Sequence, residues 1–439
     1  MKLPFLRAHR ARFVAALGAL VLLAAGPAQA QLRLDITQGV RDAVPIAVVP
    51  FGGQGANPAT DVAGVIANDL RLSGRFAPLE ARDLVSRPTT GSEIRFDEWR
   101  MLRSDFIVVG HVEPDRAGIA VTYELFNVRT GQPLLSQRLV SNERGLRATS
   151  HRIADAIFER LTGIPGAFST RIAYVAVEGR PPAQRYRLIV ADADGFGPRT
   201  VLESTEPIMS PAWSQDGQSL AYVSFEGKIS AIYVQRLASG ERRRVSARSG
   251  INGAPAWSPD GRRLALTLSR DGNLDLYVLD LATQALTRVT NDDAIDTEPE
   301  WAADGTSLYF TSDRAGSPQI YQVPVGEGRE PQRLTFTNSY NARPRLAPDG
   351  KSLALVTLDR GGYRIATFDL QTRNLRVLTD ATQDESPSFA PNGAVIIYAT
   401  QAGGRGALAM VSSDGRFQQR LSSERGDVRE PVWSPFPRP

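Results

Sequence analysis

One short phrase returns six times in the second part of the chain, and its spacing limits the fold more than any other feature. The phrase reads PAWSPDG at Pro255–Gly261, and related copies begin at Pro211, Pro299, Pro344, Pro387 and, truncated to PVWSP, at Pro431. From proline to proline the copies are 44, 44, 45, 43 and 44 residues apart. A fixed period of about 40–45 residues is typical of a propeller blade of four strands. Each copy is expected to supply an innermost strand, followed by a tight turn in which glycine takes a positive φ.

The order of the strands predicts how the propeller closes. Second strands and innermost strands each occur six times, but the region opens on a second strand at Ile172–Val175 and ends on an innermost strand after Pro431. The truncated last copy therefore supplies the missing innermost strand of the first blade, so that no open edge is left at the seam. We expect an all-β six-bladed β-propeller over residues 171–439, closed by strand exchange between its ends.

Two sets of repeated residues have structural interpretations. The tryptophans Trp213, Trp257, Trp301 and Trp433 share one repeat position, which predicts packing between blades. The aspartates Asp216, Asp260, Asp304 and Asp349 are expected to form turns, not to act as catalytic carboxylates.

The first thirty residues have the pattern of a signal peptide. A basic start is followed by the apolar run Phe13–Ala25 and by AQA at Ala28–Ala30, which predicts Gln31 as the mature N-terminus. The alternative, a membrane anchor, would need roughly 20 apolar residues. Residues 1–30 hold four of the 51 Lys and Arg and none of the 47 Asp and Glu, so 47 of each sign remain. This balance gives no indication of a nucleic-acid surface. Because there is no cysteine, we expect a periplasmic protein held together without disulfides.

Between the signal peptide and the propeller, the patterns predict a small α/β domain over residues 45–165. Amphipathic helices are expected at Asp61–Gly74 and Leu146–Leu161, buried strands at Ile46–Phe51 and Asp105–Val112, and a hairpin at Ile119–Val128 and Leu134–Val140. Ahead of this domain, in residues 31–44, Leu32, Leu34 and Ile36 alternate with Arg33 and Asp35. This segment is either an edge strand of the small domain or a strand that pairs with a partner's sheet.

Catalytic chemistry finds little support in the sequence. His111 and His151 are the only histidines of the mature chain, and both precede the propeller, so a late histidine for a Ser-His-Asp site is missing. No metal-ligand spacing occurs either. The oxygen-rich run Asn291–Asp296 suggests a solvated acidic loop, with a calcium ion in the propeller channel as the alternative. The sequence therefore predicts a non-enzyme without a cofactor, against the alternatives of a periplasmic ligand-binding propeller or the accessory domain of a hydrolase.

A binding surface is expected at one mouth of the propeller channel. The connections that lead into the innermost strands all emerge there, as do the loops between second and third strands, for example Arg270–Asn273 and Asp313–Ser317. Loops on a rigid scaffold are the usual place of recognition.

The order of these features resembles the TolB family, the periplasmic component of the Tol–Pal envelope system. The similarity covers nearly the whole mature chain, including PIAVVPF at Pro45–Phe51, LTGIPGAFSTRIAYV at Leu161–Val175, NGAPAWSPDG at Asn252–Gly261 and DGRFQQRL at Asp414–Leu421. The chain departs from the family at Ile251, where relatives can carry histidine.

The resemblance implies a monomeric, non-enzymatic coupling protein without a membrane span, acting in outer-membrane constriction at division and in envelope integrity. It implies that the lipoprotein Pal binds the propeller mouth and that the C-terminal domain of TolA binds the N-terminal segment as a mobile strand. The corresponding mouth residues are Met209, Ser210, Ile251, Asn252, Gly253, Ala254, Asp296, Thr297, Glu298, Asn341, Arg343, Asp384, Glu385, Arg429 and Glu430. The corresponding TolA-binding residues are Leu32, Arg33, Leu34, Asp35, Ile36 and Thr37.

Overall fold

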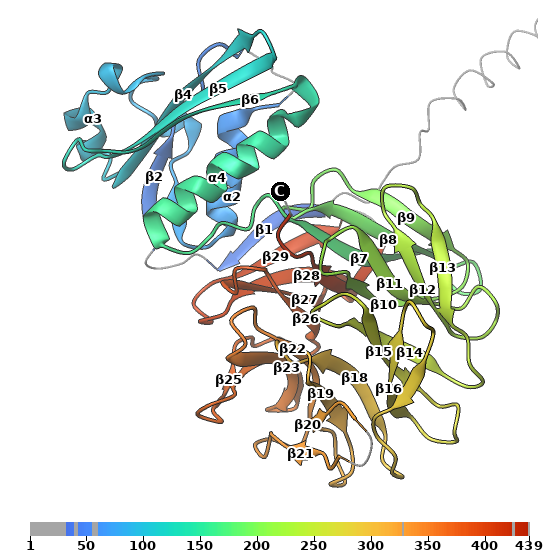
Figure 1. The fold of residues 1–439 in the computed structure, drawn as a ribbon. Coiled ribbons are helices and arrows are strands. Elements are labelled where there is room, and N and C mark those ends of the chain that lie inside the picture. Colours follow the sequence, from blue (N-terminus) through green and yellow to red (C-terminus); the bar gives the residue numbers. More distant parts are fainter. Residues whose placement is uncertain (1–31, 39–42, 55–59, 327–328, 424–425, 438–439) are drawn as a thin grey trace, which may run out of the picture.

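The computed structural model describes residues 32–38, 43–54, 60–326, 329–423 and 426–437, and the predicted signal peptide lies outside them. The chain forms a small α/β domain and a six-bladed β-propeller, as expected (Figure 1). The α/β domain sits at one end of the propeller, next to the blades where the ring closes.

The α/β domain is built on a mixed five-stranded sheet in the order β3-β2-β4-β5-β6. Both β3 and β4 run parallel to β2, whereas β4, β5 and β6 form an antiparallel meander. The strands are β2 (Val44–Val48), β3 (Phe76–Pro78), β4 (Phe106–Asp115), β5 (Gly118–Asn127) and β6 (Pro133–Ser141).

Two helices carry the apolar faces that the sequence predicted. Helix α2 (Val62–Leu72) begins after Asp61, whose carboxylate accepts a hydrogen bond from the Gly64 amide, and α4 (Leu146–Thr162) ends at Gly163 with φ of 73°. They share one core with the sheet. The second core lies under the short helix α3 (Phe96–Met101), where Trp99 is fully buried. Single turns of 3₁₀-helix occur at Ala81–Asp83, Gly91–Glu93 and Glu143–Gly145. The sequence did not predict β3 or α3.

The propeller closes as the strand order predicted. The last strand, β30 (Asp427–Trp433), pairs antiparallel with β7 and is the innermost strand of blade one. Blade one continues with β7 (Arg171–Glu178), β8 (Arg185–Asp192) and β9 (Arg199–Ser204).

The next four blades each have four antiparallel strands in sequence order. Blade two is β10 (Ile208–Trp213), β11 (Ser219–Ser224), β12 (Ala231–Arg236) and β13 (Arg242–Ser246). Blade three is β14 (Asn252–Trp257), β15 (Arg263–Leu268), β16 (Asp275–Asp280) and β17 (Leu286–Arg288). Blade four is β18 (Asp296–Trp301), β19 (Ser307–Ser312), β20 (Gln319–Pro324) and β21 (Gln332–Arg333). Blade five is β22 (Asn341–Leu346), β23 (Ser352–Asp359), β24 (Gly362–Asp369) and β25 (Leu375–Val377).

Blade six has a fifth strand, which comes from the other end of the chain. Its own strands are β26 (Glu385–Phe389), β27 (Val395–Ala402), β28 (Arg405–Ser412) and β29 (Gln418–Ser423). The N-terminal strand β1 (Leu32–Gln38) pairs antiparallel with β29 at the outer edge, with Leu34 opposite Leu421. The alternative of an edge strand in the small domain is therefore wrong, because β1 extends the propeller and not the α/β sheet.

The repeated tryptophans join neighbouring blades, as predicted. The indole N–H of Trp257 donates to the Ala212 carbonyl oxygen at 3.2 Å, and that of Trp301 donates to the Ala256 carbonyl oxygen at 3.1 Å. At the seam, the indole N–H of Trp433 donates to Thr170 Oγ1 at 2.7 Å. A buried indole needs such a partner, so these residues have a structural role.

Candidate functional site

The residue before each repeated proline has a backbone conformation that side chains rarely adopt. All six have a positive φ of 45–57°, and the register of each innermost strand shifts at this point. We call them the channel ring: Ser210, Ala254, Glu298, Arg343, Ser386 and Glu430. A positive φ in a non-glycine residue costs of order 1–3 kcal/mol and is often found at functional sites. Because this conformation recurs in all six blades, it is a regular feature of the channel and not a local irregularity.

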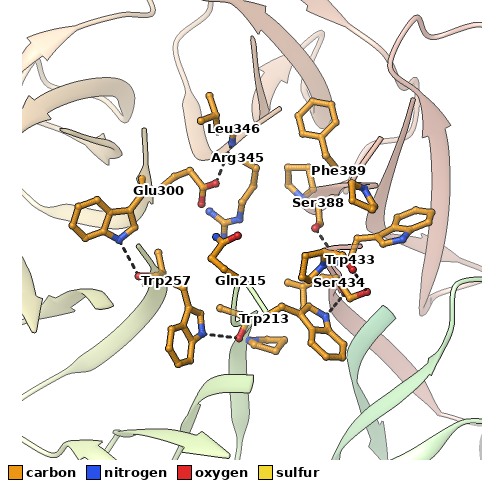
Figure 2. A pocket seen from close by; sticks show the side chains of 18 of the residues that line it. Trp213, Gln215, Trp257, Glu300, Arg345, Leu346, Ser388, Phe389, Trp433 and Ser434 are labelled. Atoms are coloured by element: carbon orange, nitrogen blue, oxygen red, sulfur yellow. Dashed lines mark hydrogen bonds between the residues drawn. The ribbon is translucent and has the colours of Figure 1, made fainter. Parts of the chain in front are cut away.

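The channel ring lies between two cavities. The larger has a volume of about 680 Å³ and includes all six ring residues in its lining. This cavity continues to the turns that follow the innermost strands. The α/β domain lies at the same end of the channel, because Asn392 in the β26–β27 turn donates to the Pro165 carbonyl oxygen. Figure 2 shows its tryptophans around Glu300 and Arg345. The second cavity, of about 560 Å³, opens at the predicted mouth between blades five, six and one.

Charged side chains cross the channel ring. Arg343 Nε donates to Glu298 Oε1 at 2.5 Å, and the Arg343 guanidinium also donates to Ser386 Oγ. On the other side of the ring, Glu430 accepts the backbone N–H of Ser210. Burial raises the pKa of Glu430, and the charge of Arg343 offsets only part of this rise. The ring therefore holds two acidic side chains and one guanidinium, and a cationic group on a ligand that reaches the ring would favour the ionised form of Glu430.

The predicted mouth residues separate into an exposed group and a buried group. Ile251, Met209 and Glu385 reach the surface. By contrast, four polar residues expected at the surface are fully buried: Asn252, Asp296, Asn341 and Asp384. They occupy one repeat position, three residues before each proline, where they lie between neighbouring blades. The structure therefore places these four side chains beneath the mouth and not on its surface.

Asn252, Asp296 and Asn341 have internal partners that explain their polarity, whereas the two carboxylate oxygens of Asp384 are buried without a hydrogen-bond partner among the described residues. Asn252 accepts from Ser246 Oγ at 2.7 Å, and its amide donates to the Arg248 carbonyl oxygen at 2.8 Å. Asn341 of blade five donates to Oε1 of Gln319 in blade four at 2.9 Å. Buried polar groups need such partners. The hydrogen bonds of Asn252 and Asn341 therefore hold the backbone of the mouth loops in place.

One arginine pairs with two of the three aspartates in the acidic run Asn291–Asp296. Arg314 donates to both carboxylate oxygens of Asp296, at 3.0 and 2.8 Å, and forms an ion pair with Asp292 at 3.0 Å. Burial raises the pKa of Asp296, and Arg314 acts against this rise. Asp296 is therefore a buried partner of Arg314 and not the solvated residue that was expected.

Exposed apolar side chains surround one half of the mouth. Ile251 is 51% exposed and Ile295 is 45% exposed, and both stand four residues before a repeated proline. Met209 and Ile229, from blade two, are exposed as well. The sequence reading named Ile251 and Met209 but missed Ile295 and Ile229. The shared repeat position would have identified Ile295. The mouth thus combines exposed aliphatic side chains on blades two to four with a cavity on blades five, six and one, which charged residues line together with Tyr340 and Tyr363.

Comparisons with known proteins match both domains. Residues 158–437 match the family model described as TolB beta propeller domain, and residues 32–134 match the TolB amino-terminal domain. The Tol-Pal system protein TolB of Xanthomonas euvesicatoria is 54% identical over 97% of this chain and 98% of its own length, and the protein of the same name from Xanthomonas campestris gives the same values.

A solved structure agrees with these matches. The crystal structure of TolB from Acinetobacter baumannii superposes with a TM-score of 0.86 at 43% identity, covering 92% of this chain and 100% of the other. Among the residues that the structure describes, no helix has the length and apolar character needed to cross a bilayer. The chain belongs to the TolB family of the Tol–Pal system.

Proposed function

We propose that this chain is a non-enzymatic, monomeric coupling protein of the periplasm, which links TolA to the lipoprotein Pal during outer-membrane constriction at cell division. Pal would bind the propeller mouth, and the C-terminal domain of TolA would bind Leu32–Thr37. Membership in the TolB family makes the chain a component of the Tol–Pal system. The two partner sites are the part that we infer from the geometry.

The observation that carries this proposal is the pairing of β1. This strand occupies the outer edge of blade six and forms no part of the four-stranded repeat. A strand at a sheet edge can exchange one backbone partner for another, and a partner's sheet would use the same hydrogen-bonding groups that now face β29. Docking on the propeller and binding to TolA would therefore exclude each other.

The propeller mouth has the composition of a protein-binding surface. Its exposed apolar residues on blades two to four would supply buried area, whereas Glu385 and the channel ring would favour a basic residue of Pal. Burial of the apolar half would mainly determine the rate of dissociation, and the charges would mainly determine the rate of association.

A reversible cross-link between β1 and β29 tests the exclusion directly. Arg33 lies opposite Ser422, and facing residues of antiparallel strands have Cα atoms about 4.5–5.5 Å apart, within the range of a disulfide. Because the chain has no cysteine, the double variant R33C/S422C can form only this disulfide within one molecule, and the oxidised monomer is separated from cross-linked dimers by gel filtration. We expect the oxidised protein to bind Pal normally and to lose TolA binding, which reduction restores.

The single variants R33C and S422C, under the same oxidising conditions, control for effects of the substitutions. Undiminished binding of TolA to the oxidised double variant would rule out Leu32–Thr37 as an exchanging strand. If the unmodified chain bound TolA normally but did not bind Pal, the proposal for Leu32–Thr37 would remain, and the proposal that Pal binds the propeller mouth would be rejected.

A small-molecule function is the second candidate. The larger cavity has a volume of about 680 Å³ and holds Glu300 and Arg345 among tryptophans (Figure 2), and ligand pockets of about 300–1,000 Å³ are common. Burial raises the pKa of Glu300, with Arg345 acting against the rise. Co-purification of a low-molecular-weight compound lost on R345M substitution would favour this candidate.

A further inference from the structure

A cluster of charged side chains joins the α/β domain to blade one. From the α/β domain, α2 contributes Asp69, and α4 contributes Arg147 and His151. From the propeller, the end of β8 and the turn after it contribute Asp192 and Asp194. His151, Asp69 and the Asp194 side chain are 3%, 1% and 4% exposed. Charges so far from water persist only when they are paired.

His151 is the central member of this cluster. Its Nδ1 lies 2.7 Å from Asp69 Oδ2, in its own domain, and its Nε2 lies 3.7 Å from Asp192 Oδ2, in the propeller. Asp155, one turn along α4, is engaged elsewhere, since it accepts the backbone N–H groups of Phe168 and Ser169 in the linker. The imidazole therefore stands between carboxylates of the two domains, an arrangement that suits a doubly protonated ring.

Arg147 makes the second connection across the joint. Its Nε donates to Asp192 Oδ2 at 3.2 Å, its Nη2 donates to Asp194 Oδ2, and its guanidinium carbon lies 3.7 Å from the centroid of the Phe196 ring. Asn68 adds a longer contact to Asp194 at 3.4 Å. Two cationic side chains of the α/β domain thus hold two carboxylates of the propeller.

The electrostatics agree with this geometry. Burial alone would lower the pKa of His151, but Asp192, Asp69 and Asp194 outweigh it and raise that pKa to about 10. Burial acts to raise the pKa of Asp192, yet His151 and Arg147 lower it below the ordinary value. Burial raises the pKa of Asp69 to about 7, against the effect of His151. The order of the two pKa values favours the imidazole as the site of the proton shared by Asp69 and His151.

We propose that His151 and Arg147 form an ionic latch with Asp192 and Asp194, which holds the α/β domain on blade one in a single orientation. Among the described residues, the other polar contacts between the domains are fewer: Asn392 to the Pro165 carbonyl oxygen, and Arg75 to Asp414 at 4.0 Å. An interface of this kind between domains permits relative motion when its specific contacts are lost. Release of the latch would let the α/β domain turn about the linker.

Spin labels can measure the orientation of the domains, because the chain has no native cysteine. Met101, on α3, and Phe336, in the propeller, are 77% and 73% exposed and can be replaced by cysteine. In the double-labelled protein with the native latch, we expect one narrow distance distribution by pulsed electron resonance. We expect D192N and H151Q each to broaden the distribution at least twofold, with unchanged circular dichroism.

D192N is the more decisive variant. The Asp192 carboxylate contacts Arg147 and His151 across the joint, so its replacement by asparagine leaves the interior of the α/β domain untouched. H111Q, which changes the other mature histidine, is the matched control and should leave the distribution narrow. A narrow, unshifted distribution in both D192N and H151Q would overturn the latch.

The protonation state of His151 gives an independent readout. With only two histidines in a chain that begins at Gln31, nitrogen chemical shifts can be assigned by H111Q alone. We expect an imidazolium at pH 7.5 for His151, and a neutral ring would overturn the proposal. Asp69, His151 and Asp194 also have ligand atoms within 4.8 Å of one another. If EDTA broadened the distance distribution and zinc alone restored it, a metal site would replace the latch.

Discussion

Removal of the last strand is the sharpest test of how the propeller closes. A chain that ends at Gly426 lacks β30 and leaves β7 without its inner partner. It also loses Val428, which is fully buried in the core shared by blades one and six. Three hydrogen bonds across the seam disappear with it: Trp433 Nε1 to Thr170 Oγ1, the Ser434 amide to the Arg171 carbonyl oxygen, and Trp213 Nε1 to the Val432 carbonyl oxygen.

The size of the effect follows from these contacts. Burial of a valine side chain contributes about 1.5–3 kcal/mol, and each hydrogen bond contributes about 1 kcal/mol net. These contacts alone amount to about 5 kcal/mol, before the ladder between β30 and β7 is considered. Since a domain is stable by about 5–15 kcal/mol and about 1 kcal/mol shifts Tm by about 2–4 °C at this size, we expect Tm to fall by at least ~10 °C.

Thermal unfolding followed by circular dichroism measures this fall. A chain that ends at Pro437 is the matched control and should unfold with the full-length protein. V428A provides an intermediate step, because it removes two methyl groups from the same core and should cost about 2 kcal/mol. A Tm of the Gly426 truncation within ~2 °C of the control would refute closure by β30.

Three further predictions concern the channel and the joint. I251E should weaken Pal binding at least tenfold in calorimetry without lowering Tm. N252A should lower Tm, because it leaves buried groups unpaired. The reverse pattern would contradict the assignment of Ile251 to the exposed surface of the mouth and of Asn252 to the buried group. R343M should cost about 3 kcal/mol in urea unfolding, with partial recovery when E298Q is added, and no recovery would mean that the pair is not coupled. The stabilising effect of His151 over H151Q should be full below about pH 6.5 and be lost as the pH rises towards 10; a constant difference in free energy of unfolding between pH 6 and 10 would contradict it.

The repeat made the fold predictable because each blade is specified locally. Apolar strands, tight turns and the proline phrase recur with one period, so a register found in one blade applies to the others. The phase of the first and last copies then identified β30 as the closing strand. By contrast, β3 and α3 are three and six residues long. Such short elements have too few residues to show a periodicity.

The position of β1 could not be predicted for a different reason. The alternation from Leu32 to Ile36 indicates a strand, but a period of two does not say which sheet edge the strand joins. Its partner β29 lies almost 400 residues away in sequence. The burial of Asn252 and Asp384 was missed because a polar residue in a predicted loop was taken to face water. In the structure, these loops descend between blades, where Asn252 takes polar groups of the protein as partners in place of water.

The repeat builds a symmetric scaffold, and the side chains that differ between the repeats determine the charge and polarity of the channel. All six positions of the channel ring share one backbone conformation, so the backbone alone would produce a sixfold ring. The side chains break this symmetry, since Glu298 and Arg343 come from blades four and five and Glu430 comes from blade one. The exposed isoleucines come from blades two to four, so blade four alone contributes to both groups. A partner with its own sixfold symmetry would gain nothing from such a surface. A single protein with an apolar patch on one side and a basic group on the other would fit it in one orientation only.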